Sequence, residues 1–115
     1  MIQTKRVYEK PDRTDGFRIL VDRLWPRGLT KERAHVHLWM KDIAPSDALR
    51  KSYHASEDWP EFEKRYRKEL AAKQDLFAEI KRLEQEHKTV TLLFGRKDEK
   101  QNQAVILAAI LKGKK

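Results

Sequence analysis

The sequence predicts an α/β fold: a small single domain of residues 1–115 with a short, mostly parallel sheet flanked by helices. Three observations predict it. The chain has 115 residues, the size of one domain. Short runs of β-branched and apolar residues come before and after stretches with helical periodicity. The most apolar of the short runs, residues 89–94, is typical of a central parallel strand.

Elements of the first half of the chain are short. Residues 2–8 contain β-forming residues and predict a first strand. Residues 17–22 alternate between two faces and predict a second strand. Residues 31–34 have the composition of a short helical turn. Residues 35–40 predict a third strand or extended segment.

Helices dominate the next part. Ser46 is a good N-cap for a helix over residues 47–54, and Asp58 followed by Pro60 marks the start of a second helix. That second helix carries an apolar stripe at intervals of four, namely Phe62, Tyr66 and Leu70. A third helix is indicated by apolar spacing over residues 76–83.

A strand and a closing helix end the chain. Gly95 stops the strand over residues 89–94, and Asp98–Asn102 predict a turn or cap. Residues 104–111 are apolar throughout and predict a buried helix that Gly113 ends. We expect a core that includes Trp39, Phe62, Tyr66, Val90, Leu92, Phe94, Ile106 and Ile110.

Composition excludes several classes of protein. Hydrophobic residues make up 39% of the chain and charged residues 38%, which suits a globular rather than a disordered protein. The chain has no cysteine, so disulfides, thiol nucleophiles and iron–sulfur clusters are excluded. It shows neither a signal-peptide core nor an apolar run of membrane-spanning length. We therefore expect a cytoplasmic protein that does not contact the membrane.

Positive charge is concentrated at the two chain ends. The net charge is +8. Residues 1–33 hold nine basic and five acidic residues, and residues 88–115 hold seven and two. This distribution is either a solubility feature with a basic tail at residues 112–115, or a sign that both ends meet in one face that attracts anions.

The segment 22–28 is the first candidate for function. It follows the second predicted strand, and ligands of α/β sheets bind beyond the carboxyl ends of strands. Arg23 and Arg27 could grip a phosphate or carboxylate with paired N–H groups, and Trp25 could stack on a ring. The alternative is a structural loop in which Asp22 pairs with an arginine and Trp25 fills the core.

The start of the helix at Ser46 is the second candidate. Free backbone N–H groups at a helix start attract anions, and Lys41 and Arg50 flank this one. The alternative is an ordinary capped helix with Arg50 in solvent. Asp47 argues for that alternative, because its carboxylate could already occupy the positive end of the helix.

Two further segments carry polar groups. His54 is either a general base or a surface histidine at a helix end. Gly95, Arg96 and Asn102 either border the same pocket as Arg23 and Arg27, or serve with Asp98 as a turn and cap.

Other chemistries lack support in the sequence. His35 and His37 alternate on one predicted strand face, but no carboxylate at matching spacing completes a metal site. Phosphate loops of the Walker type, dinucleotide-binding glycine motifs and serine nucleophile elbows do not occur in the sequence. We therefore assign no metal, cofactor or catalytic residue.

The segments above resemble the YeaO-like family of small bacterial proteins, a domain of unknown function. The run 15–28, which includes Arg-Leu-Trp-Pro-Arg-Gly at 23–28, is the most specific part. Residues 39–54, 59–70 and 90–104 extend the resemblance over nearly the whole chain. It implies a compact cytoplasmic α/β domain and no particular reaction.

Two positions depart from the family pattern. His37 stands where the family usually has an acidic residue, two before Trp39, and Ser52 replaces an aromatic residue just before Tyr53. If the acidic position is catalytic in the family, this chain is altered or inactive there.

The sequence thus predicts a pocket for an anionic small molecule, either phosphorylated or nucleotide-like. The residues expected to bind this ligand are Arg23, Trp25, Arg27, Lys41, Ser46, Arg50, His54, Asp98 and Asn102. Whether the protein is an enzyme stays open. The alternatives are a nucleic-acid-binding module that uses the basic chain ends and an interaction domain without a site.

Overall fold

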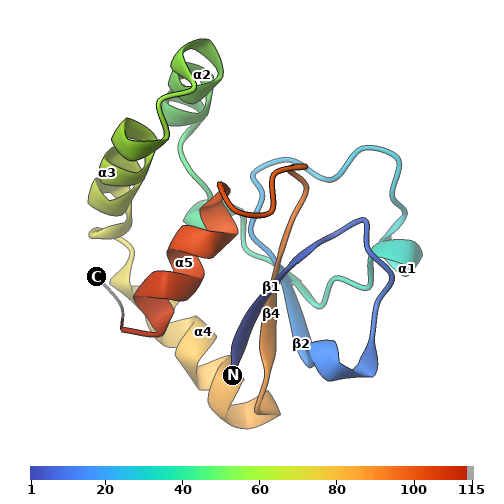
Figure 1. Cartoon of the computed structure of the whole chain (residues 1–115). Helices are drawn as coiled ribbons and strands as arrows, with labels where there is room; N and C mark the ends of the chain where they lie inside the picture. The colour runs from blue at the N-terminus through green and yellow to red at the C-terminus, as the bar shows by residue number, and fades with distance from the viewer. Residues whose placement is uncertain (114–115) are drawn as a thin grey trace.

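A four-stranded parallel sheet forms the centre of the fold. The computed structural model describes residues 1–113. The strands are β1 (Ile2–Arg6), β2 (Phe17–Leu20), β3 (Leu38–Trp39) and β4 (Val90–Phe94), in the order β1-β4-β2-β3. All pairings are parallel, which confirms the predicted fold class (Figure 1).

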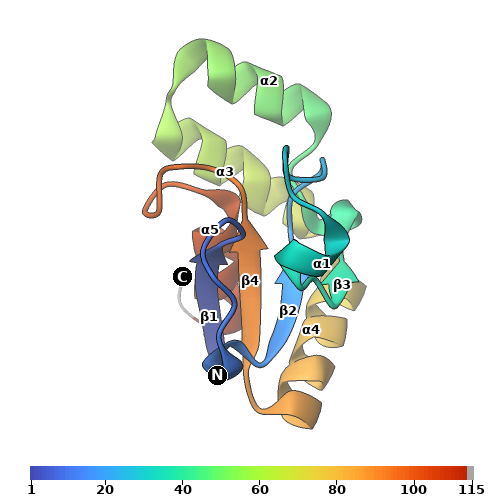
Figure 2. The same cartoon turned by 90° about the vertical axis from the view of Figure 1, so that its right-hand side faces the viewer.

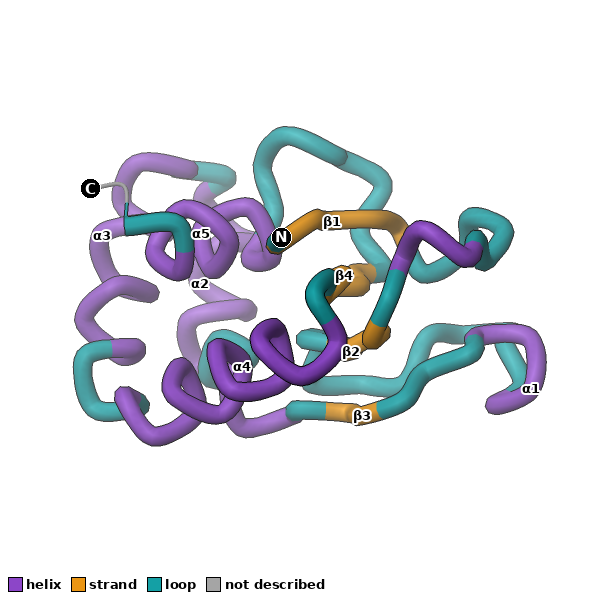
Figure 3. The backbone as a smooth tube through the Cα atoms, turned by 90° about the horizontal axis from the view of Figure 1, so that it is seen from below, coloured by secondary structure: helices purple, strands orange, loops and turns teal. Residues whose placement is uncertain are grey.

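Helices lie on both faces of the sheet, in unequal numbers. They are α1 (Lys31–Ala34), α2 (Asp47–Ser56), α3 (Trp59–Leu70), α4 (Gln74–His87) and α5 (Gln103–Leu111). Seen from below, α4 and α5 cover one face, and α1 lies beyond the other (Figure 3). The α2–α3 pair stands above the carboxyl ends of the strands (Figure 2).

Strand β4 lies between β1 and β2, and its side chains are therefore buried on both faces of the sheet. All five of its residues are buried. Leu92 and Phe94 pack into the main core under the helices, whereas Leu93 joins a smaller cluster with Val7 and Leu20 on the opposite face. The apolar run 89–94 therefore predicted its position correctly.

Side-chain caps fix the starts of α2, α3 and α5, and Thr30 caps the short α1 in the same way. Ser46, Asp58 and Asn102 accept hydrogen bonds from the backbone N–H groups three residues ahead, at 3.1, 3.2 and 3.1 Å. Each cap satisfies a backbone donor that has no partner within the helix. The predicted starts at Ser46 and Asp58 are confirmed.

The third predicted strand is mostly irregular. Of residues 35–40, only Leu38 and Trp39 pair as β3. His35 takes a left-handed conformation, with φ of 50°, and ends α1. The prediction that His35 and His37 share a strand face is therefore wrong, because neither residue belongs to β3, although the His37 N–H donates to the Arg18 carbonyl at 2.9 Å.

The predicted core is largely buried. Phe62, Tyr66, Leu92, Phe94 and Ile106 belong to the main core. Val90 does too, whereas Trp39 and Ile110 are half-buried. Within residues 1–113, we find no helix with the length and apolar character needed to cross a membrane.

Candidate functional site

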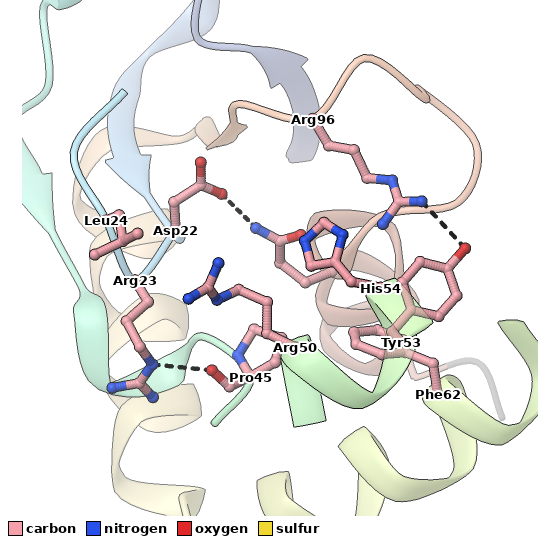
Figure 4. Close-up of a pocket in the computed structure, with 10 residues that line it drawn as sticks. Asp22, Arg23, Leu24, Pro45, Arg50, Tyr53, His54, Phe62 and Arg96 are labelled. Carbon is pink, nitrogen blue, oxygen red and sulfur yellow. Dashed lines mark hydrogen bonds between the residues drawn. The ribbon is translucent and has the colours of Figure 1, made fainter. Parts of the chain in front are cut away.

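A cavity of about 450 Å³ opens at the carboxyl ends of β2 and β4. Figure 4 shows how side chains from the loops after these strands and from α2 surround one space. This is where open α/β sheets usually bind ligands. The cavity is lined by Asp22, Arg23, Leu24, Pro45, Arg50, Tyr53, His54, Phe62, Arg96 and Gln103.

Asp22 forms the acidic part of the wall. Its Oδ2 accepts a hydrogen bond from the Gly95 N–H at 2.8 Å, and its Oδ1 accepts one from the Gln103 side chain. Burial raises the pKa of the Asp22 carboxyl to about 6, against the lowering effect of these two hydrogen bonds. A Cβ on residue 95 would lie 2.8 Å from Oδ2, so a glycine there permits the close approach.

Arg23 is held against the backbone of the loop before α2. Its Nε donates to the Pro45 carbonyl at 3.0 Å, and Nη2 donates to the Ala44 carbonyl at 3.3 Å. Figure 4 shows its guanidinium turned toward Pro45. Arg23 therefore joins the loop after β2 to the start of α2.

Arg50 projects from the first turns of α2. Its Nη2 lies 2.6 Å from a carboxylate oxygen of Asp47. Its Nε is buried and has no hydrogen-bond partner among residues 1–113. Leaving such a donor without an acceptor costs about 1–3 kcal/mol.

Arg96 and Tyr53 form the opposite wall. The Arg96 guanidinium carbon lies 4.6 Å from the centre of the Tyr53 ring, and Nη2 donates to the Tyr53 hydroxyl at 3.1 Å. Phe62 packs beside Tyr53 with the ring centres 5.0 Å apart. These contacts fix the guanidinium over an aromatic surface.

The rim of the cavity is open to solvent. His54 is exposed, and Leu24 exposes 62% of its surface. Leu24 is one of the few large apolar side chains left in solvent, and it stands at the mouth of the cavity.

Three of the nine predicted ligand-binding residues line this cavity, namely Arg23, Arg50 and His54. Arg96, which we also expected beside Arg23, lies there too. Their predicted role in binding a ligand stays a prediction.

Trp25, Arg27 and Lys41 lie elsewhere. The Trp25 indole donates to the Leu29 carbonyl at 2.7 Å and packs in the smaller cluster across the sheet. Arg27 is exposed and outside the cavity lining. The Lys41 ammonium lies 4.2 Å from the centre of the Trp39 ring.

The helix start at Ser46 already holds an anion from the chain itself. The Ser46 N–H and hydroxyl donate to the two carboxylate oxygens of Glu69 at 2.9 and 2.6 Å. Glu69 thus takes the place that we expected for an external anion.

Asp98 and Asn102 make local hydrogen bonds. Asp98 accepts from the backbone N–H groups of Lys100 and Gln101, both at 2.9 Å. The Asn102 side chain caps α5 and donates to the Asp98 carbonyl at 2.9 Å. Neither residue lines the cavity.

The predicted set omits several lining residues: Asp22, Leu24, Pro45, Tyr53, Phe62, Arg96 and Gln103. Asp22 and Arg96 carry a usable signal, since each closely follows a strand that the sequence predicts. Gln103 and Pro45 carry none, because only the folded arrangement brings them to the cavity.

The two departures from the family pattern lie outside the cavity. His37 stacks on Phe17, and its Nδ1 accepts a hydrogen bond from the Arg18 N–H near the start of β2. Ser52 accepts a hydrogen bond from Arg65 at 3.0 Å. Neither residue lines the cavity.

Comparisons with known proteins give a family and no solved structure. Residues 1–114 match the sequence profile described as the inactive DUF488-N3 subclade. The Escherichia coli K12 protein YeaO, named as uncharacterised, is 44% identical over 110 residues that cover 93% of each chain. The uncharacterised proteins Mb3100c of Mycobacterium bovis and Rv3073c of Mycobacterium tuberculosis are each 40% identical over 114 residues, covering 98% of this chain and 95% of theirs. No solved structure matches the chain. The chain therefore belongs to the YeaO-like DUF488 family, whose function is unknown.

Proposed function

We propose that this protein binds an anionic small molecule in the cavity above β2 and β4. One observation carries the proposal. Three arginines, Arg23, Arg50 and Arg96, line a cavity to which the described residues contribute a single carboxylate, Asp22. The excess of fixed positive charge favours an anion.

Arg50 gives the most direct support. Its buried Nε lacks an acceptor among residues 1–113, and Asp47 engages only one of its terminal nitrogens. A phosphate or carboxylate oxygen would supply the missing acceptor. Charge-assisted hydrogen bonds of this kind are stronger than neutral ones.

Arg96 supports the same ligand from the other side. A guanidinium has five N–H donors, and the Tyr53 hydroxyl takes one of them. Its stacking on Tyr53 holds the group in place before a ligand arrives. Such preorganisation lowers the entropy lost on binding.

The form of the cavity favours a small molecule over a nucleic acid. Its volume of about 450 Å³ lies in the range of small-molecule pockets. A nucleic-acid binder needs many phosphate contacts, and its affinity falls steeply as salt rises. The family description as an inactive subclade supports binding without turnover.

Calorimetric titration with inorganic phosphate tests the proposal. Arg50→Gln should weaken phosphate binding about tenfold or more, because it removes a charged donor at the cavity. Arg82→Gln is the matched control, since Arg82 also pairs with helix neighbours, Glu79 and Glu86, but lies outside the cavity. Equal weakening in both variants, or no binding by the wild type, would refute the proposal.

A further inference from the structure

Asp22 is a carboxylate without a cation in a cavity lined by arginines. None of the ion pairs within residues 1–113 includes it. Arg23 donates to backbone carbonyls, Arg50 pairs with Asp47, and Arg96 contacts Tyr53. The arginines that could neutralise Asp22 are thus held by other groups.

The carboxylate keeps unused acceptor capacity. A carboxylate offers about four lone-pair positions. Asp22 uses one on each oxygen, for the Gly95 N–H and the Gln103 side chain. These two donors also fix the orientation of the carboxylate in the cavity wall. A fixed buried acceptor discriminates strongly between ligands that supply a donor and ligands that do not.

We propose that Asp22 accepts a hydrogen bond from the ligand, so that this ligand is an anion whose uncharged part carries an N–H or O–H donor. This inference rests on the proposed function, because it places the anionic end of the same ligand at Arg50 and Arg96. Planar amides, imides and hydroxylated rings have the required chemistry.

A neutral donor fits this cavity better than a cationic one. An ammonium group near Asp22 would share the cavity with three guanidinium groups, and like charges repel. A neutral N–H or O–H group is not repelled by the guanidinium groups in this way. The apolar surfaces of Leu24, Pro45 and Phe62 would cover the body of the ligand between its two polar ends.

Two matched probes test this inference by calorimetry. Orotate carries one carboxylate and two ring N–H donors, and 1,3-dimethylorotate has the same charge and ring without those donors. We expect the wild-type protein to bind orotate about tenfold or more tightly than its dimethyl analogue, because a hydrogen bond to a charged acceptor is lost.

The variant Asp22→Asn completes the comparison. It should reduce the preference for orotate to less than about threefold, since the amide replaces the charged acceptor. A preference that survives in Asp22→Asn would reflect steric rejection of the methyl groups and would overturn the inference. Equal affinity of the wild type for the two probes would also overturn it, and needs no variant.

Failure of the proposed function gives a different result. If the wild type binds phosphate and this binding depends on Arg50, the anion site is supported. The comparison of orotate with its dimethyl analogue then tests only the role of Asp22. If phosphate and both probes fail to bind, or if Arg50→Gln leaves binding unchanged, the proposed function fails, and the inference fails with it.

Discussion

Asp22 is a half-buried carboxylate whose charge lowers the stability of the fold while it offers an acceptor to the cavity. Burial raises the pKa of its carboxyl from 3.8 to about 6 on folding. Between these values the folded state holds a proton that the unfolded state releases. The free energy of unfolding contributed by Asp22 therefore falls as pH rises through this window and levels off above about pH 6.

Asp22→Asn should consequently stabilise the protein at pH 8. Removing a buried charge should raise the free energy of unfolding by up to about 3 kcal/mol, which is the free-energy equivalent of the pKa shift. The gain should fall below about 1 kcal/mol at pH 4, where the carboxyl is protonated in the folded state and about half protonated in the unfolded state. Urea unfolding of both proteins at pH 8 and pH 4 measures this. A loss of stability at pH 8 would mean that the carboxylate holds Gly95 and Gln103 more strongly than burial disfavours it.

Hydrogen bonds near the start of α2 position the helices that form the walls of the cavity. Ser46 caps α2 and also donates to Glu69 of α3. The Tyr66 hydroxyl of α3 donates to the Ile43 carbonyl at 2.6 Å, and burial raises the pKa of that hydroxyl well above its ordinary value. These bonds fix the α2–α3 pair to the segment before α2.

Ser46→Ala should weaken this attachment. It removes the cap of α2 and one donor to Glu69, so we expect a loss of about 1–2 kcal/mol in the free energy of unfolding. Ser52→Ala is a suitable control, because among residues 1–113 the Ser52 hydroxyl bonds only to the exposed Arg65, and the substitution should cost less than about 0.5 kcal/mol. Chemical unfolding measures both values. Equal losses would show that the cap is unimportant.

Phe62→Ala probes the packing of the same pair of helices. Phe62 is 7% exposed and packs on Tyr53, Trp59 and Tyr66. Its truncation should cost about 3–5 kcal/mol, because it leaves a void in the aromatic cluster. Calorimetric or urea unfolding gives the value. A cost below about 1 kcal/mol would show that the helices close over the gap.

Local signals account for most of the elements that the sequence predicts. Caps such as Ser46 and Asp58 and apolar runs such as 89–94 act within a few residues, so they can be recognised without the fold. The prediction of a strand or extended segment over residues 35–40 is only partly confirmed. Leu38 and Trp39 pair as β3, whereas His35 takes a left-handed conformation, for which the sequence gives no clear sign. For Trp25 the sequence left two alternatives open, and the structure agrees with the one in which Trp25 packs in the core, away from the cavity.

The cavity itself was only partly predictable because it is assembled at the scale of the whole molecule. Strand order brings the loops after β2 and β4 together, so Arg23 and Arg96 border one cavity as the sequence suggested, whereas Arg27 and Asn102, expected at the same pocket, do not line it. The occupation of the α2 start by Glu69 depends on how α3 folds back, which no local pattern reveals. Because the contact with Glu69 is not visible in the sequence, the start of α2 was expected to bind an external anion.

The fold also brings the positive charge of the two chain ends close together. Strand β1 pairs with β4, so basic segments from both chain ends are neighbours. Arg6 of β1 donates to the Arg96 carbonyl at 3.0 Å, which ties these ends together beside the cavity. Of the basic tail at residues 112–115, Lys114 and Lys115 lie outside the described residues. Long-range attraction from these charges should raise the rate of anion binding and weaken with salt.

The most direct test of an anion site in this cavity is a titration of the wild-type protein with inorganic phosphate, followed by backbone amide chemical shifts. We predict that the largest and saturable shifts occur at residues 22–24, 50, 53, 54 and 96, which line the cavity. Residues 27–28 and 97–100, which lie outside the lining, should shift little. Saturable shifts centred on those outer segments, with the cavity amides unmoved, would contradict the account.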